Sequence, residues 1–572
     1  MSKQQGMIGR DGRGWVVAAA MTLAATMVFA QQPLAGVPPQ PAVGSAFGVS
    51  SALRIGPLQA SSKQSTPPEV APRQAGKITA EQAKQLFSLV DELIKFSSGE
   101  TGLPIKSDVK RQITSRAAVE SYLTQKMAED ESAKRMQRDE IVLKKFGLID
   151  RDFALKPFLL ALLKEQIEAY YDAKTKTVYM LDWVDIEEQK PVLAHELTHA
   201  LQDQHIDLEK WSDQTPDDVS LNAAGDTGHL AEDEMDTARD AVVEGQATAV
   251  MMDYILKPMG KSIVKDPEIM DFVNEQMSAS ENSPVLARAP LLLSESMLFP
   301  YREGLNFEQD VWMDQGQAAA FTGTLDHPPT SSWEILNPRE YEMRHKPAIP
   351  LLPNIHPLVD SLYKPYDIGQ VGQLDLRILA QLYGGEQESR DLTSAWDGGL
   401  YWAGQQLTAK PPKELASTNS IALFYLSAWK NAASAQAFTR LYVDELGRKY
   451  SGVKLETVAN SATQETGFKR FPPPAPSEAV STDQEQVYST SEGPVVITTR
   501  GKLVFVAESF PLELARKLTA LVLDAQGTGE FKMASAAQPD NLGQSLTANL
   551  VRFFSNCGVM KAAVDATVQA AK

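Results

Sequence analysis

The sequence of 572 residues is long enough for about three or four domains. Its composition, 43% hydrophobic and 22% charged, is typical of a chain that buries a core. The net charge of −18 excludes nucleic acid as the main partner, because phosphate binding needs a basic surface. The single cysteine, Cys557, excludes an intrachain disulfide.

Residues 1–30 have the pattern of an export signal. Lys3, Arg10 and Arg13 form a basic start, and an apolar run follows them. The Val-Phe-Ala at the end of this run resembles a signal-peptidase cleavage site. The run is short for a membrane span, which needs about 20 residues. We therefore expect a signal peptide, export to the periplasm or out of the cell, and no stable membrane span after its removal. The alternative is an uncleaved N-terminal anchor.

The next predicted elements lead from a linker into a folded domain. Residues 31–77 are rich in Pro, Gln and Ser, which indicates a flexible linker or a leader removed on maturation. Thr79 and Gln82 fit a capping box at the start of a helix. Residues 118–147 have a helical pattern, and aromatic and β-branched residues around the turn formers of residues 169–181 predict a hairpin.

A helix predicted to start at Pro191 carries the motif His-Glu-Leu-Thr-His. His195 and His199 are four residues apart, so they lie on one helix face and both can bind one Zn²⁺. Glu196 is placed to act as the general base that activates the attacking water. This is the H-E-x-x-H motif of zinc peptidases. Its apolar flank argues against the alternative, two histidines on a solvated helix face.

A catalytic zinc needs a third protein ligand, and the sequence offers two candidates. His205 has the spacing of the third histidine of metzincins. However, Gln202 stands where a glycine would break the helix, and in a continuing helix His205 points away from the metal. Glu244 lies on a second predicted helix over residues 233–256, where the small Gly245 would let another helix pack closely. Its alternative is a surface glutamate.

Three stretches of the chain, residues 195–205, 243–248 and 328–338, resemble a group of uncharacterised bacterial gluzincin-like zinc metallopeptidases. The resemblance covers about residues 80–450 and implies a zincin-like fold. It also implies that the strand near residues 178–181 is the edge strand above the cleft, where an extended peptide would bind.

The same resemblance implies the roles of the site residues. His195, His199 and Glu244 would bind one catalytic zinc ion, and Glu196 would be the base. Gln246 stands where an acidic residue is common in the group. This difference leaves the metal ligands unchanged. It affects the residues that orient the ligands through hydrogen bonds.

A gluzincin-like site also needs a group that stabilises the oxyanion of the tetrahedral intermediate. His229, Tyr301 and His327 are candidates by residue type, and we predict Tyr301 as the catalytic residue among them. Asp240 precedes Glu244 by one helical turn and is a candidate partner for it. For each of these residues, a structural or surface role is the alternative.

The predicted fold class is α+β, predominantly helical. A zincin-like catalytic domain is expected over residues 78–356, followed by a helical domain over residues 357–470. A Pro-rich linker, residues 471–485, precedes a small α+β module, residues 486–572. The module is expected to contain a hairpin around Gly501 and a helix.

These features together predict an exported zinc-dependent peptidase that acts on a peptide or protein substrate. The alternative is a catalytically weak or inactive zinc-binding protein that acts in the cell envelope through its interactions. The sequence leaves the substrate, the position of the cleaved bond and the oligomeric state open.

Overall fold

The computed structural model describes most of the chain from Ile78 onward. The described residues are 78–129, 131–212, 222–278, 283–461, 483–526 and 546–570. About 59% of them are helical, in a mixed α+β fold with one large antiparallel sheet and one small mixed sheet. The predicted signal peptide, the linker or leader at residues 31–77 and most of the predicted Pro-rich linker lie outside these residues. Within them, every helix is too short or too polar to cross a membrane.

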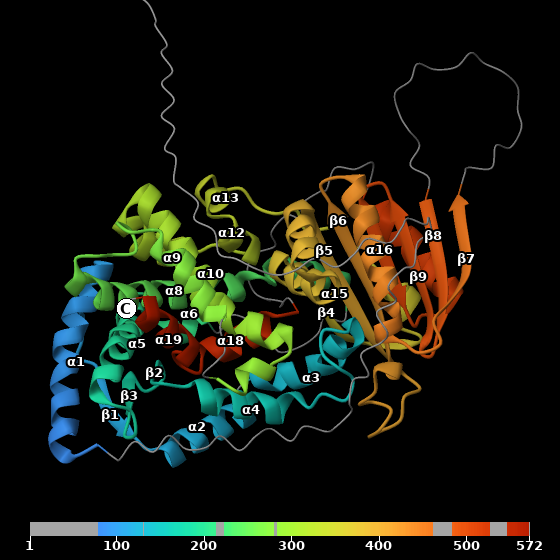
Figure 1. The fold of residues 1–572 in the computed structure, drawn as a ribbon. Coiled ribbons are helices and arrows are strands. Elements are labelled where there is room, and N and C mark those ends of the chain that lie inside the picture. The colour runs from blue at the N-terminus through green and yellow to red at the C-terminus, as the bar shows by residue number, and fades with distance from the viewer. Residues whose placement is uncertain are drawn as a thin grey trace, which may run out of the picture. The chain divides into compact units, whose positions relative to one another are not determined.

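The N-terminal part of the described chain is mostly helical and holds a small sheet (Figure 1). Its elements are α1 (Ala80–Thr101), β1 (Lys110–Thr114), α2 (Arg116–Glu129), α3 (Glu131–Phe146), α4 (Leu155–Gln166), β2 (Tyr170–Asp172), β3 (Thr177–Leu181), α5 (Ile186–Ile206), α6 (Leu208–Ser212), α7 (Ala223–Glu232), α8 (Met235–Leu256), η1 (Lys257–Met259), α9 (Ile269–Ser278), η2 (Leu286–Arg288), α10 (Leu291–Gln315), the π-helical η3 (Ala319–Gly323), α11 (Thr324–Asp326), α12 (Ser332–Leu336) and α13 (Pro338–Glu342). The capping box predicted for Thr79 and Gln82 is confirmed at the start of α1.

The small sheet has the strand order β1-β3-β2. The predicted hairpin is confirmed, because β2 and β3 pair antiparallel with Tyr170 opposite Tyr179. The prediction that β3 is the edge strand is wrong. β1 comes from a distant part of the sequence and pairs in parallel with the other side of β3. β2 is therefore an edge strand, and β3 is central.

Helix α5, which carries the His-Glu-Leu-Thr-His motif, begins earlier than predicted. Asp185 caps it by accepting a hydrogen bond from the Glu187 backbone N–H at 2.9 Å. Pro191 lies inside the helix instead of at its start. Its missing N–H removes only one backbone hydrogen bond, the one to a carbonyl of the first turn. The helix therefore tolerates the proline. Most side chains of the helix from Val192 to Asp203 are buried.

Helices α8 and α10 approach each other closely at two glycines. A Cβ on Gly245 would lie 2.3 Å from the carbonyl carbon of Gly304, and a Cβ on Gly304 would lie 2.1 Å from the Ala241 carbonyl oxygen. The two backbones therefore touch, which confirms the prediction that another helix packs at Gly245. Tyr301 lies one turn before Gly304 and so faces α8 near Glu244.

The C-terminal part of the described chain builds one seven-stranded antiparallel sheet. The strand order is β4-β5-β6-β10-β9-β8-β7. Its elements are α14 (His356–Val359), β4 (Tyr363–Gln370), α15 (Gln373–Ala395), β5 (Trp396–Gln406), η4 (Thr418–Ser420), β6 (Ile421–Trp429), α16 (Ala432–Lys449), β7 (Lys454–Ser461), β8 (Asp483–Thr490), β9 (Gly493–Arg500), β10 (Leu503–Glu508) and α17 (Leu512–Ala525). The predicted hairpin around Gly501 and the helix after it are confirmed.

The prediction of a helical domain over residues 357–470 is wrong, because this segment supplies four strands of the large sheet. Strand β6 shows why. Tyr425 packs on Phe438 of α16, whereas Phe424 packs on Phe510 on the other face. With both faces buried, the strand is a continuous apolar run, and such a run does not show the alternation that distinguishes a strand from a helix.

The predicted C-terminal module is also divided. Its strands complete the large sheet, whereas α18 (Ala548–Ser555) and α19 (Lys561–Ala570) return to the helical part and pack among α8, α9 and α10 (Figure 1). Arg552 of α18 pairs with Asp236 at 2.8 Å, and the Thr547 hydroxyl donates to Asp375 at 2.7 Å. The end of the chain is thus part of the domain that carries the His-Glu-Leu-Thr-His motif.

The contact between α8 and α10 gives a first prediction. Gly304→Ala should lower the free energy of unfolding by about 2 kcal/mol, because the new methyl group forces the two backbones apart. The matched control is Gly447→Ala in α16, where a Cβ would meet nothing within 4 Å. We expect this control to be neutral or to stabilise by about 0.5–1 kcal/mol. Urea unfolding followed by circular dichroism measures both, and equal effects would contradict the close contact.

Candidate metal centre

The predicted metal ligands converge at one buried point. His195 and His199 of α5 have their Nε2 atoms 3.0 Å apart. Glu244 of α8 places Oε2 3.1 Å from His195 Nε2 and 3.5 Å from His199 Nε2. Ligand atoms bound at about 2.1 Å around a tetrahedral ion lie about 3.4 Å apart, so the three atoms fit one ion. This triad could hold a metal ion.

Charge holds the triad together in the absence of an ion. Burial lowers the pKa of His199, but the adjacent Glu244 carboxylate outweighs burial and raises that pKa to about 9. Burial raises the pKa of Glu244, but the imidazoles of His199 and His195 outweigh it and bring that pKa to about 2. A metal ion would therefore replace a proton that His199 shares with Glu244, and binding would release that proton.

Gln202 fixes the orientation of His199. Its amide nitrogen donates to the Val243 carbonyl and to Gln246 Oε1, each at 3.0 Å. Its amide oxygen therefore accepts, and the partner at 2.9 Å is His199 Nδ1. In the neutral imidazole that binds a metal, the proton is then on Nδ1. Nε2 has a lone pair directed at the metal position. From the sequence, Gln202 is recognisable only as a good helix former, because its partners Val243 and Gln246 lie on another helix.

Gln246, atypical of the gluzincin-like group, has a local explanation. Its amide nitrogen donates to the Ala320 and Phe321 carbonyls at 2.9 Å and to the Thr324 hydroxyl at 2.8 Å. Its oxygen accepts from Gln202. An ionised carboxylate has no proton to donate to these acceptors, so the site requires an amide here.

Glu196 lies beside the triad and is fully buried. Burial raises the pKa of its carboxyl group. One carboxylate oxygen accepts a hydrogen bond from the Val559 backbone N–H at 3.2 Å, and the other has no hydrogen-bond partner within the described part of the chain. The carboxylate is thus in contact with a peptide amide from the C-terminal segment.

Tyr301 lies beside His195. The two rings are stacked, with centroids 6.1 Å apart and planes at 24°. Burial raises the pKa of the Tyr301 hydroxyl well above its usual value, so the hydroxyl stays protonated. It donates to the Gly558 carbonyl oxygen at 3.2 Å. Tyr301 is therefore a neutral hydrogen-bond donor beside the metal ligands.

Two other residues considered as metal or oxyanion ligands lie apart from the triad. α5 continues through Gln202 to Ile206, so His205 is turned away and interacts with Asp326 at 2.9 Å. The metzincin-like arrangement is therefore not present. His327 is exposed on the surface.

Asp240 lies nearer to the site. It lines the cavity that also reaches Glu244, and burial raises the pKa of its carboxyl group well above the usual value. The Glu244 carboxylate contacts His195 and His199. The predicted interaction of Asp240 with Glu244 stays a prediction.

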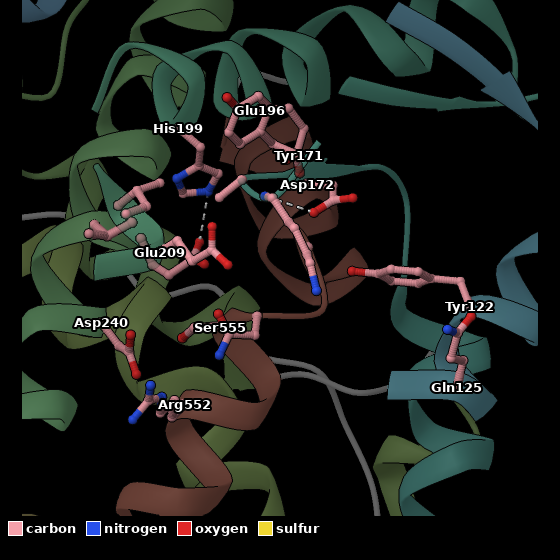
Figure 2. A pocket seen from close by; sticks show the side chains of 17 residues that line it. Tyr122, Gln125, Tyr171, Asp172, Glu196, His199, Glu209, Asp240, Arg552 and Ser555 are labelled. Atoms are coloured by element: carbon pink, nitrogen blue, oxygen red, sulfur yellow. Dashed lines mark hydrogen bonds and ion pairs between the residues drawn. The ribbon is translucent and has the colours of Figure 1, made fainter. Parts of the chain in front are cut away.

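A cavity of about 520 Å³ opens beside the triad. Glu196 and His199 line it from α5, and Arg552 and Ser555 line it from α18 (Figure 2). Tyr171 and Asp172 of β2 form a further wall. The part played by α18 was missed in the sequence analysis, because no local motif marks a contact between segments more than 350 residues apart.

Comparison of the chain with protein-family models, with curated proteins and with solved structures gave no match. The resemblance to gluzincin-like peptidases therefore stays a prediction.

The triad gives a second prediction. Glu244→Ala should abolish stoichiometric zinc binding, because two imidazoles alone leave a catalytic-type site one ligand short. His205→Ala is the matched control and should keep its zinc. Metal content after dialysis, measured by mass spectrometry, decides between the two. Loss of zinc in the histidine variant alone would overturn the ligand set.

Proposed function

We propose that the chain is an exported zinc-dependent peptidase of gluzincin-like type. The observation that carries the proposal is the convergence of two histidines and Glu244 from a separate helix, with the Glu196 carboxylate beside them at an open cavity. Three protein ligands leave one position open for chemistry, as in catalytic zinc sites, whereas structural zinc sites are closed by four. Export rests on the N-terminal sequence pattern alone.

The donor set favours zinc as the ion. Imidazole nitrogen and carboxylate oxygen suit Zn²⁺, and His₂Glu is one of its catalytic ligand sets. When bound, zinc would polarise the carbonyl of the scissile peptide bond and lower the pKa of water.

Glu196 would act as the general base and then as the general acid. It would take a proton from the attacking water and deliver it to the nitrogen of the leaving amine. Two observations support these roles. Burial raises the pKa of its carboxyl group, which favours its role as a proton acceptor, and its carboxylate already accepts a hydrogen bond from a backbone N–H.

Tyr301 would stabilise the negative charge that develops on the carbonyl oxygen. A neutral, fully buried hydroxyl is a fixed donor in a site of low dielectric constant, where such a bond is strong. Its present contact with a peptide carbonyl oxygen supports this role.

A second candidate function is zinc binding without hydrolysis. It is favoured by one observation, the presence of Gly558 and Val559 against the two proposed catalytic groups. A protein whose metal face is permanently covered would bind zinc and act through its other surfaces.

Glu196→Gln gives a third prediction, which separates the two functions. The variant should keep its zinc but lose at least about 100-fold in hydrolysis of a quenched fluorescent peptide library, because the amide cannot take a proton. Glu188→Gln is the matched control on the exposed face of the same helix and should behave as wild type. Equal hydrolysis by wild type and Glu196→Gln would exclude the mechanism.

Tyr301→Phe gives a fourth prediction. Removal of the one hydroxyl should lower kcat by about 100-fold and leave KM and zinc content nearly unchanged, because the donor acts mainly on the transition state. Steady-state kinetics on a cleaved peptide measures both constants. A rise in KM with unchanged kcat would assign Tyr301 to substrate binding instead.

A further inference from the structure

The connection between α18 and α19, residues 556–560, lies along the edge of the small sheet. Met560 forms an antiparallel bridge with Ile167, and the Glu168 N–H donates to the Val559 carbonyl at 3.4 Å. Ile167 and Glu168 lead directly into the edge strand β2. Extended peptides bind to exposed sheet edges by this kind of backbone pairing. We refer to residues 556–560 as the C-terminal loop.

One peptide group of the C-terminal loop makes both contacts that the proposed mechanism requires of a substrate. The Gly558 carbonyl oxygen accepts from the Tyr301 hydroxyl at 3.2 Å. The N–H of the next residue, Val559, donates to the Glu196 carboxylate at 3.2 Å. In hydrolysis, these two groups would stabilise the oxyanion and protonate the leaving nitrogen. The Gly558–Val559 peptide bond thus contacts the same two side chains that a scissile bond would contact.

Gly558 permits this close fit. Its φ of +98° lies in the region that favours glycine. A Cβ there would also lie 2.2 Å from the Ala169 carbonyl oxygen and 2.6 Å from Tyr170 Cβ. Any side chain at this position would therefore push the loop away from the sheet edge, and with it the peptide bond away from Glu196 and Tyr301.

The helices on either side hold the loop in place by contacts outside the metal site. Arg552 of α18 pairs with Asp236, and the N–H of Ala562 in α19 donates to Gln166 Oε1 at 3.1 Å. The cavity borders the loop at Gly558. α18 and α19 are therefore anchored by contacts other than those that the loop makes with Glu196 and Tyr301.

We propose that the C-terminal loop is an autoinhibitory substrate mimic, displaced when a peptide substrate pairs with residues 167–169. This inference rests on the proposed peptidase function. The chain continues on both sides of the Gly558–Val559 peptide bond as it passes through the site. A substrate that takes its place is therefore an extended peptide that is cleaved at an internal bond. Hydrolysis by the native protein is limited by the fraction of molecules in which the loop has moved aside.

The test compares zinc-loaded Gly558→Ala with wild type and with the control Gly447→Ala. Two quantities are measured on folded protein: the rate at which a maleimide labels the buried Cys557, the only cysteine of the sequence, and the hydrolysis of a quenched fluorescent peptide library. We expect both to rise about tenfold or more in Gly558→Ala, as for a loop that covers the site about nine-tenths of the time, and neither to rise in the control. A synthetic peptide of residues 555–561 with serine for cysteine should then inhibit the variant competitively.

The outcomes separate the inference from the function. If Cys557 labelling rises but hydrolysis equals that of an active wild type, the loop is not inhibitory, although the peptidase function stands. If labelling rises and no variant hydrolyses any peptide, the peptidase function itself fails. The intact mass of the wild-type protein is also measured. Cleavage after Gly558 would overturn the proposal that the loop is a stable substrate mimic.

A second variant covers the case in which Gly558→Ala does not fold. Val559→Pro removes the N–H that binds Glu196 and adds no side chain at residue 558. It should raise hydrolysis in the same way, and the double variant Val559→Pro with Glu196→Gln should be inactive. An unchanged rate in folded Val559→Pro would overturn the proposal.

Discussion

A carboxylate buried between two imidazoles is the interaction on which the site depends. A charge as deeply buried as that of Glu244 costs several kcal/mol unless it is paired at close range. The pairing requires α8 to lie within ligand distance of α5. Gly245 and Gly304 allow α10 to pack directly against α8, because neither helix carries a side chain at the contact. The geometry of the metal centre therefore depends on the packing of α5, α8 and α10.

The groups behind the ligands extend this constraint. His199 is oriented by Gln202, Gln202 by Gln246, and Gln246 by carbonyls of the π-helical turn η3. Each amide in this series both donates and accepts, so each fixes the direction of the next bond. An acidic side chain in place of Gln246 would require a different set of partners on η3. The glutamine at position 246 is thus matched by the backbone around it.

The end of the chain gives the site a substrate-like group of its own. α18 and α19 return from the large sheet to the helical part, and the loop between them brings a peptide bond to Glu196 and Tyr301. The same contacts that recommend these two residues for catalysis also cover them. In the proposed peptidase, activity and occlusion would therefore be linked by geometry, and the position of one short loop would decide between them.

The sequence by itself determined what depends on local spacing. Helical periodicity places His195 and His199 on one face with Glu196 next to them, and aromatic and β-branched residues around turn formers define the hairpin of β2 and β3. Only the tertiary structure decided which distant groups complete the site: Glu244 as the third member of the triad, Gln202 behind His199, and Gly558 and Val559 against the proposed catalytic groups. It also decided that residues 363–461 supply four strands of the large sheet, because apolar runs such as β6 are buried on both faces and lose the alternation of a strand. Local spacing is fixed by backbone geometry, whereas contacts between distant segments depend on how their faces pack.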